Sequence, residues 1–175
     1  MGDRDEYSTT SDLPSEPRSP RERWATRAGL LLLALVVLAG AVGLLGPRKG
    51  TTSASAAGYQ LTVVYPAITR AGEPAPLHVR VESASGFSGK IQLALCDDLF
   101  DDLDFQNWYP NPSAETGDTG KLLYEFDPPD SDVFEVSLDA RSAPGAFGEI
   151  EDCRVRLLED DDELVSVSFH TWRMP

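Results

Sequence analysis

Hydrophobic residues follow two different patterns along this chain. Residues 28–47 form one run of twenty residues without a charged side chain. At about 1.5 Å of rise per residue, a helix of that length matches the ~30 Å hydrocarbon core of a bilayer, so the run predicts a transmembrane helix. From Tyr59 onward, hydrophobic and polar residues alternate instead, which is typical of strands that bury one face.

The alternation divides the C-terminal part into short segments separated by Gly, Pro and Asp. These segments predict strands at residues 60–65, 77–82, 91–95, 121–126, 134–139, 153–158 and 164–172. The acidic stretch at residues 159–163 predicts a five-residue hairpin connection between the last two strands. About seven strands without a helical period predict an all-β domain over 59–175, an immunoglobulin-like β-sandwich, with an open barrel as the alternative.

Neither segment that flanks the apolar run predicts a folded element: residues 1–27 have no hydrophobic periodicity, and residues 48–58 lack large apolar residues. Residues 1–27 are rich in Ser, Thr, Pro and charges of both signs, and therefore predict a disordered tail. Residues 48–58, with the sequence RKGTTSASAAG, predict a flexible linker between helix and domain.

Positive charge lies mainly before the apolar run, which predicts the orientation of the helix. The residues concerned are Arg18, Arg21, Arg23 and Arg27 before the run, and Arg48 and Lys49 after it. By the positive-inside rule the N-terminus is cytoplasmic, and Trp24 suits the membrane interface. We therefore expect a single-pass protein of a bacterial plasma membrane with an extracytoplasmic C-terminal domain. A cleaved signal peptide is the alternative, because residues 54–58, ASAAG, resemble a cleavage site.

Charge narrows the classes of partner. The chain from Tyr59 onward has 23 acidic and 8 basic residues, a net charge of -15. A surface this acidic repels phosphate backbones, so we expect no nucleic acid partner. Basic protein segments and cations are the partners that this charge attracts.

The two cysteines, Cys96 and Cys153, flank predicted strands in a compartment where disulfides persist. We expect them to form a disulfide. Two buried free thiols are the alternative if the strands are not neighbours, and a redox-active pair is disfavoured because the cysteines lack CxxC spacing.

An acidic loop follows Cys96, with the sequence DDLFDDLDFQNWYP at residues 97–110. Its candidate metal ligands are Asp98, Asp101, Asp102 and Asp104, and Ca²⁺ is the cation that carboxylates of this kind bind outside cells. The spacing does not fit an EF-hand, because no glycine occupies the sharp turn. A site shared with Asp160, Asp161 and Asp162 requires both loops to lie at one end of the domain. We expect no other cofactor.

The same loop also predicts a docking surface for a protein or cell-envelope partner. Exposed aromatics would anchor such a partner, and carboxylates would select its basic groups. The candidate residues are Phe100, Asp101, Asp102, Asp104, Phe105, Trp108 and Tyr109. The alternative is that these aromatics cover the open end of the sandwich as part of its core.

The sequence contains few features that would indicate an enzyme. The two histidines, His78 and His170, occupy outward-facing or terminal strand positions, and the chain has no GxSxG, HExxH, P-loop or dinucleotide-binding motif. Paired aspartates leave an envelope hydrolase as a distant alternative.

Three segments carry a resemblance to a known type of domain: AGEPAPLHVRVESASG at residues 71–86, CDDLFDDLDF at 96–105 and KLLYEFDPPDSDVFEVSLDA at 121–140. Their alternation and turns resemble bacterial extracytoplasmic immunoglobulin-like modules of the DUF11 or CARDB type. The resemblance implies an adhesion, spacer or cell-surface binding role without catalytic residues. This chain differs in having one copy, an N-terminal anchor and a more acidic loop. We therefore expect a non-catalytic, membrane-anchored binding module, with a calcium-binding module as the alternative.

Overall fold

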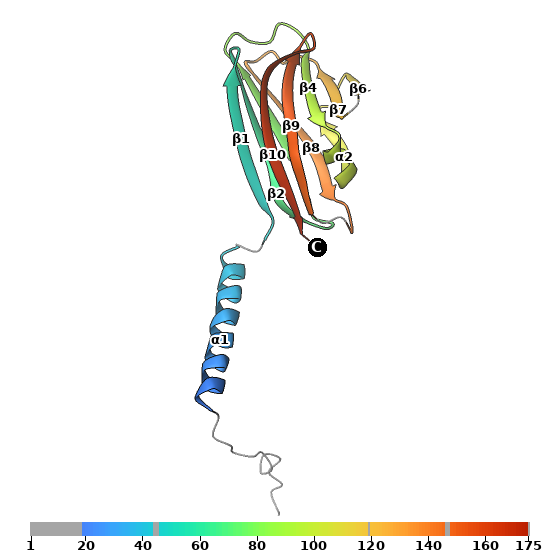
Figure 1. Cartoon of the computed structure of the whole chain (residues 1–175). Helices are drawn as coiled ribbons and strands as arrows, with labels where there is room; N and C mark the ends of the chain where they lie inside the picture. The colour runs from blue at the N-terminus through green and yellow to red at the C-terminus, as the bar shows by residue number, and fades with distance from the viewer. Residues whose placement is uncertain (1–18, 44–45, 119, 146–147, 175) are drawn as a thin grey trace, which may run out of the picture. The chain divides into compact units, whose positions relative to one another are not determined.

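The computed structural model describes residues 19–43, 46–118, 120–145 and 148–174. The chain divides into two compact units, Met1–Leu45 and Gly46–Pro175. Among these described residues, the first unit contains one helix, and the second contains a β-sheet with one short helix (Figure 1).

The described part of the N-terminal unit contains helix α1, Pro20–Ala41. It starts with a capping box: the Ser19 hydroxyl accepts from the Glu22 amide, and the Glu22 carboxylate accepts from the Ser19 amide. Pro20 at the first helical position supports the same start. Within the described residues, α1 alone is long and apolar enough to cross a membrane.

The helix differs in its bounds from the expected span of 28–47. It begins eight residues earlier because the capping box makes residues 20–27 helical, so the predicted disorder is wrong for them. It ends at Ala41, and Gly43 then takes a positive φ of 73°. The remaining tail, with Arg18, lies outside the described residues.

The C-terminal unit contains ten strands and a short helix. They are β1 Arg48–Ala56, β2 Tyr59–Arg70, β3 Leu77–Ser83, β4 Ile91–Cys96, α2 Asp98–Asp102, β5 Leu103–Tyr109, β6 Ala114–Asp118, β7 Lys121–Phe126, β8 Val133–Ser142, β9 Gly148–Glu159 and β10 Asp162–Met174. Nine strands follow the order β5-β8-β3-β2-β10-β9-β4-β7-β6, and β1 pairs with β2. The expectation of about seven strands is therefore wrong.

Strand β2 joins the two halves of this sheet. Its residues 59–64 pair antiparallel with β3, and residues 68–70 pair parallel with β10. Pro66, which has no amide hydrogen to donate, lies between the two pairings. Because one strand hydrogen-bonds to both halves, they form one curled sheet (Figure 1) rather than the two separate sheets of the expected sandwich.

The core lies between the two halves, as the alternation predicts. The inward positions of the expected strands are buried: Leu61, Val63, Leu77, Val79, Val81, Ile91, Leu93, Leu95, Phe134, Val136, Leu138, Val155, Leu157, Val165, Val167 and Phe169. Aromatic rings close the side opposite β2. Trp108 of β5 lies 4.7 Å, centroid to centroid, from Tyr124 of β7, and Phe126 of β7 lies 5.2 Å from Phe134 of β8.

Two connections differ from expectation. Residues 48–56, expected as part of a flexible linker, form β1 and pair antiparallel with β2, with one register shift between Arg48 and Lys49. The acidic hairpin between β9 and β10 has a turn of two residues, Asp160 and Asp161, because Glu159 already pairs with Asp162. Both turn residues have positive φ, 49° and 69°, as a type I′ turn requires.

Candidate functional site

Cys96 at the end of β4 and Cys153 in β9 form a disulfide, with their Cα atoms 5.4 Å apart. The expected pairing is confirmed, because β4 and β9 are neighbours in the sheet. The bond closes a loop between residues 57 positions apart, and that loop contains the whole acidic segment. One end of the segment is thereby fixed to the sheet.

The acidic segment folds into α2 and β5 rather than into an open loop. Asp97 caps α2 by accepting a hydrogen bond from the Asp98 amide. Leu99 and Leu103 are buried, with 0% and 3% of their surface exposed. The segment is therefore attached to the core by its leucines, and Asp98, Asp101 and Asp104 are left exposed at the surface.

A bulge in β5 decides which of its aromatic residues is buried. Phe105 pairs with Ala140 and Asn107 with Asp139 of β8, so Gln106 is an extra residue. The bulge shifts the alternation by one position and turns Trp108 inward and Tyr109 outward. Trp108 is 8% exposed and Tyr109 79% exposed. Trp108 therefore belongs to the core and not to a docking surface. For this ring, the alternative interpretation, in which the aromatics of the segment are part of the core, is correct.

Four of the predicted docking residues come together on one surface. We call this surface the acidic hollow, a recess of about 510 Å³ lined by Phe100, Asp101, Leu103, Asp104, Phe105, Ala143 and Pro144. The rings of Phe100 and Phe105 lie 4.1 Å apart, centroid to centroid, and both are partly buried against the core. Asp101 and Asp104 are exposed beside them. The side chain of Asp102 lies outside the described part of the structure.

The charge of the acidic hollow is only partly balanced. Arg141 of β8 lies opposite Asp104 in the β5–β8 register, and its side chain is exposed. Asp101 belongs to α2 and has no cross-strand neighbour of this kind. An apolar floor with carboxylates at its edge results, an arrangement that suits a cationic side chain with an aliphatic stem.

Tyr109, the remaining docking candidate, lies on the outer face of the sheet. With Pro110 it borders a recess of about 530 Å³ whose lining includes His78, Arg80, Glu135 and Ser137. Arg80 donates to Glu82 over 2.7 Å and also to Glu135. These bonds raise the pKa of Arg80, and the bond to Glu82 has the larger effect. The predicted docking set is thus divided between two surfaces, with Trp108 in the core between them.

A calcium site shared between the two acidic segments is excluded by the register. Gln92 of β4 pairs with Leu158, which places the turn at Asp160 and Asp161 beside the start of β4. The other acidic segment follows Cys96 at the opposite end of the same strand. Within the described residues no three His, Cys, Asp or Glu side chains are grouped as metal ligands would be. A calcium site that includes Asp102 stays a prediction.

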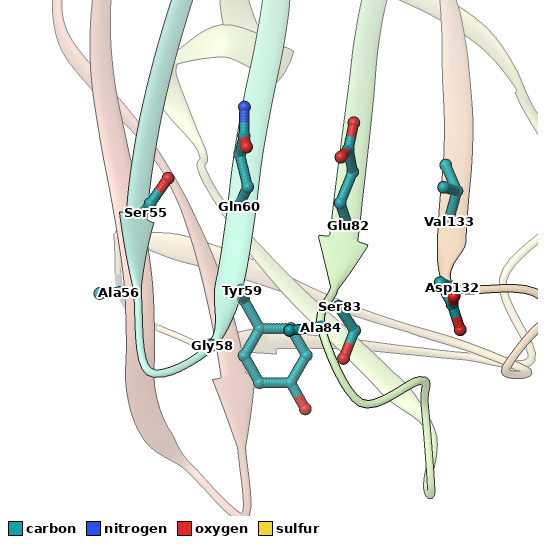
Figure 2. Close-up of a pocket in the computed structure, with 10 residues that line it drawn as sticks. All are labelled: Ser55, Ala56, Gly58, Tyr59, Gln60, Glu82, Ser83, Ala84, Asp132 and Val133. Carbon is teal, nitrogen blue, oxygen red and sulfur yellow. The ribbon is translucent and has the colours of Figure 1, made fainter.

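A further recess of about 510 Å³ lies at the β1–β2 turn (Figure 2). Gln60, Glu82 and Val133 cross its floor on three neighbouring strands, in the register of β2, β3 and β8. Glu82 is held by Arg80, and the Asp132 carbonyl accepts from the Ser83 amide. The Glu82 side chain and the Asp132 carbonyl are thus engaged in interactions within the sheet. The remaining lining consists mostly of small side chains such as Ser55, Ala56 and Ala84.

No family model and no curated protein matches this chain. Among solved structures, the CARDB domain of a Pyrococcus furiosus protein, in complex with di-metal ions, is 10% identical over 73% of this chain and 89% of its own, with a TM-score of 0.37. A β-glucosidase from Listeria innocua, in complex with gluconolactone, is 12% identical over 73% of this chain and 16% of its own, with a TM-score of 0.33. AvmM, which catalyses macrocyclization in alchivemycin A biosynthesis, is 14% identical over 72% and 98%, with a TM-score of 0.33. Likenesses this weak assign neither a fold nor a function to the chain.

Proposed function

We propose that this chain is a non-catalytic, single-pass membrane protein whose β unit lies outside the cell and binds a basic segment of an envelope protein. The acidic hollow carries the proposal: a half-buried pair of phenylalanines with exposed carboxylates at its edge. We propose that the β unit is an immunoglobulin-like domain whose strands form one curled sheet.

Two features support the membrane location. The helix α1 is long and apolar enough to span a bilayer, and Arg21, Arg23 and Arg27 lie in its N-terminal part. Arginines at that end favour a cytoplasmic N-terminus. The disulfide of the β unit is of the kind that persists in oxidising compartments.

Chemistry favours arginine or lysine as the group that enters the acidic hollow. A guanidinium above the ring of Phe100 or Phe105 gains a cation–π interaction, and the carboxylates accept its N–H groups. The net charge of -15 from Tyr59 onward steers basic segments toward the domain over longer distances. Partner recognition would then combine long-range attraction with local fit at the phenylalanine pair.

The binding test uses the full chain in a non-ionic detergent and the peptide acetyl-(Ser-Arg-Leu)₃-amide as the probe, with acetyl-(Ser-Glu-Leu)₃-amide as its charge-reversed control. We expect saturable binding of the arginine peptide alone. Asp101→Asn with Asp104→Asn should weaken it about tenfold, as loss of a charge-assisted contact of ~1.4 kcal/mol would. Asp160→Asn with Asp162→Asn removes the same charge from the β9–β10 hairpin and should change little. Equal losses in both double variants would refute a specific site.

Orientation is tested with two single cysteines in the intact chain. A membrane-impermeant maleimide applied to whole cells should label Ser88→Cys, in an exposed loop of the β unit, and not Ser8→Cys, in the tail. Labelling of Ser8→Cys alone would reverse the proposed topology. Labelling of both only after lysis would place the β unit inside the cell.

A further inference from the structure

Three of the basic residues of this acidic domain surround one small recess. Lys121 of β7 and Arg154 and Arg156 of β9 line a hollow of about 140 Å³, which we call the basic hollow. The chain from Tyr59 onward has only 8 basic residues among 23 acidic ones. A concentration of positive charge against that background marks a place where an anion is stabilised.

The sheet register explains how the three side chains meet. Strand β4 lies between β7 and β9, with Cys96 opposite Lys121 and Ala94 opposite Arg156. Two strand spacings, about 10 Å, therefore separate the backbones of Lys121 and the arginines. Long cationic side chains reach across half that distance from each side. Ala94, which lies between them and lines the recess, has only a methyl group and is itself buried.

A hydrogen bond to Arg154 and an ion pair with Arg156 hold the two arginines from the side of β10. The Nε of Arg154 donates to the Ser168 hydroxyl over 3.3 Å, and the Nε of Arg156 lies 3.5 Å from the Glu163 carboxylate. Each of these interactions uses Nε and leaves the Nη groups of the same guanidinium for other acceptors. The disulfide at Cys96 fixes β4 to β9 beneath the recess. The donors are thus positioned before any ligand arrives.

One carboxylate, that of Asp98, also lines the basic hollow and opposes an anion there. Lys121, Arg154 and Arg156 outnumber this one carboxylate in the lining, although Glu163 beside Arg156 and a further interaction of Lys121 reduce the excess of positive charge. The volume suits one small group rather than a nucleotide or a peptide. We propose that the basic hollow binds a phosphate-type oxyanion, either as a free ion or at the end of a lipid headgroup. Arginine suits this group because its planar fork bonds two phosphate oxygens at once.

The test follows the Nε–Hε NMR signals of Arg154 and Arg156 in the full chain, in a non-ionic detergent, while inorganic phosphate is added at constant ionic strength. We expect a saturable shift. Arg154→Gln and Lys121→Met should each weaken binding about tenfold, and Asp98→Asn should tighten it because it removes the opposing charge. Arg141→Gln, which removes an exposed arginine at the acidic hollow, should leave the affinity unchanged.

A second titration identifies the source of the phosphate. Micelles that contain phosphatidylglycerol are compared with micelles that contain phosphatidylcholine. Displacement of inorganic phosphate by phosphatidylglycerol would support a headgroup ligand, and its failure beside saturable phosphate binding would support a free ion. Shifts that chloride reproduces, that do not saturate, or that persist in Arg154→Gln with unchanged amide spectra would overturn the proposal. Asp98→Asn controls for misfolding, because a misfolded variant would lose affinity for phosphate, whereas this variant is expected to gain it.

Discussion

The indole of Trp108 and the phenol ring of Tyr124 lie 4.7 Å apart, at an angle of 57° between their planes, and join two strands that are not paired in the sheet. Trp108 belongs to β5, at one end of the strand order, and Tyr124 to β7, near the other end. The curled sheet is closed here by side-chain packing. A ring pair of this kind is worth about 0.5–1.5 kcal/mol beyond the area it buries.

Trp108→Ala should therefore destabilise the protein by about 3–5 kcal/mol, as aromatic truncations in cores do. Tyr109→Ala, which removes the exposed neighbouring ring, should cost about 0.5 kcal/mol or less. Urea unfolding followed by circular dichroism measures both. Comparable losses in the two variants would contradict the inward position of Trp108 and the outward position of Tyr109 that the bulge at Gln106 produces.

The raised pKa of Tyr124 should contribute to the pH dependence of the protein's stability. Burial, and then the carboxylate of Glu115, raise the pKa of Tyr124 to about 12, against an opposing hydrogen bond with Trp108. The unfolded chain has a tyrosine pKa of about 10. Because the folded state holds the proton more tightly, this contribution to stability is fully present below pH 10 and is lost as the pH rises toward 12. Unfolding midpoints of Tyr124→Phe should fall less steeply above pH 10 than those of the natural chain. Tyr109→Phe, the control, should follow the natural chain, and parallel curves for all three would refute the assignment.

Gly50 in β1 lies opposite Tyr65 in β2, and the tyrosine ring covers the glycine. A Cβ atom at position 50 would overlap with Cζ of that ring, and the same ring stacks on Phe169 of β10 at 4.5 Å. The contact explains how a strand of small residues is held on the sheet. Gly50→Ala should destabilise by about 1–3 kcal/mol, because the ring must leave its place.

The matched control for this change is Gly89→Ala, since a Cβ there meets no atom within 4 Å. It should be nearly neutral in thermal unfolding. In a Tyr65→Leu background the cost of Gly50→Ala should shrink, because the two changes share one contact. An undiminished cost in that background would indicate that strain in the β1 backbone, and not the ring, is responsible.

Strands with large hydrophobic side chains were easier to predict from the sequence than strands with small ones. The seven expected strands, which carry large hydrophobic residues, all lie within observed strands, and the disulfide followed from two of them. By contrast, β1 has only Gly, Thr, Ser and Ala after its two cations, so its pairing depends on β2 and especially on Tyr65. Neither alternation nor composition within β1 shows this. The start of α1 was predictable in principle, because Ser19, Pro20 and Glu22 have the spacing of a capping box.

The docking surface was only partly predictable because one residue, Gln106, shifts the alternation of β5. Without that bulge, Phe105, Asn107 and Tyr109 would share one face, and Trp108 would point outward. A bulge follows from the pairing with β8, which the sequence of β5 alone does not determine. The basic hollow was not predictable for a similar reason, since Lys121 and Arg154 meet only across β4.

The disulfide should contribute about 4 kcal/mol to stability in the chain-entropy model, given a loop of 57 residues. Cys96→Ser with Cys153→Ser should therefore lower the urea midpoint substantially. Reductant should lower the midpoint of the natural chain to a similar value and leave that of the double variant unchanged. A midpoint of the natural chain that is insensitive to reductant would show that the bond is absent in solution.

The hairpin between β9 and β10 is the position where a substitution should stabilise the protein. Asp160 and Asp161 both have positive φ, a conformation that costs most non-glycine residues about 1 kcal/mol or more. Asp160→Asn with Asp161→Gly supplies the residue pair that type I′ turns prefer, and should raise the free energy of unfolding by about 1 kcal/mol. Asp160→Asn with Asp161→Asn removes the same two charges without introducing a glycine. If the glycine variant is no more stable than this control, relief of charge repulsion, and not turn geometry, accounts for the gain.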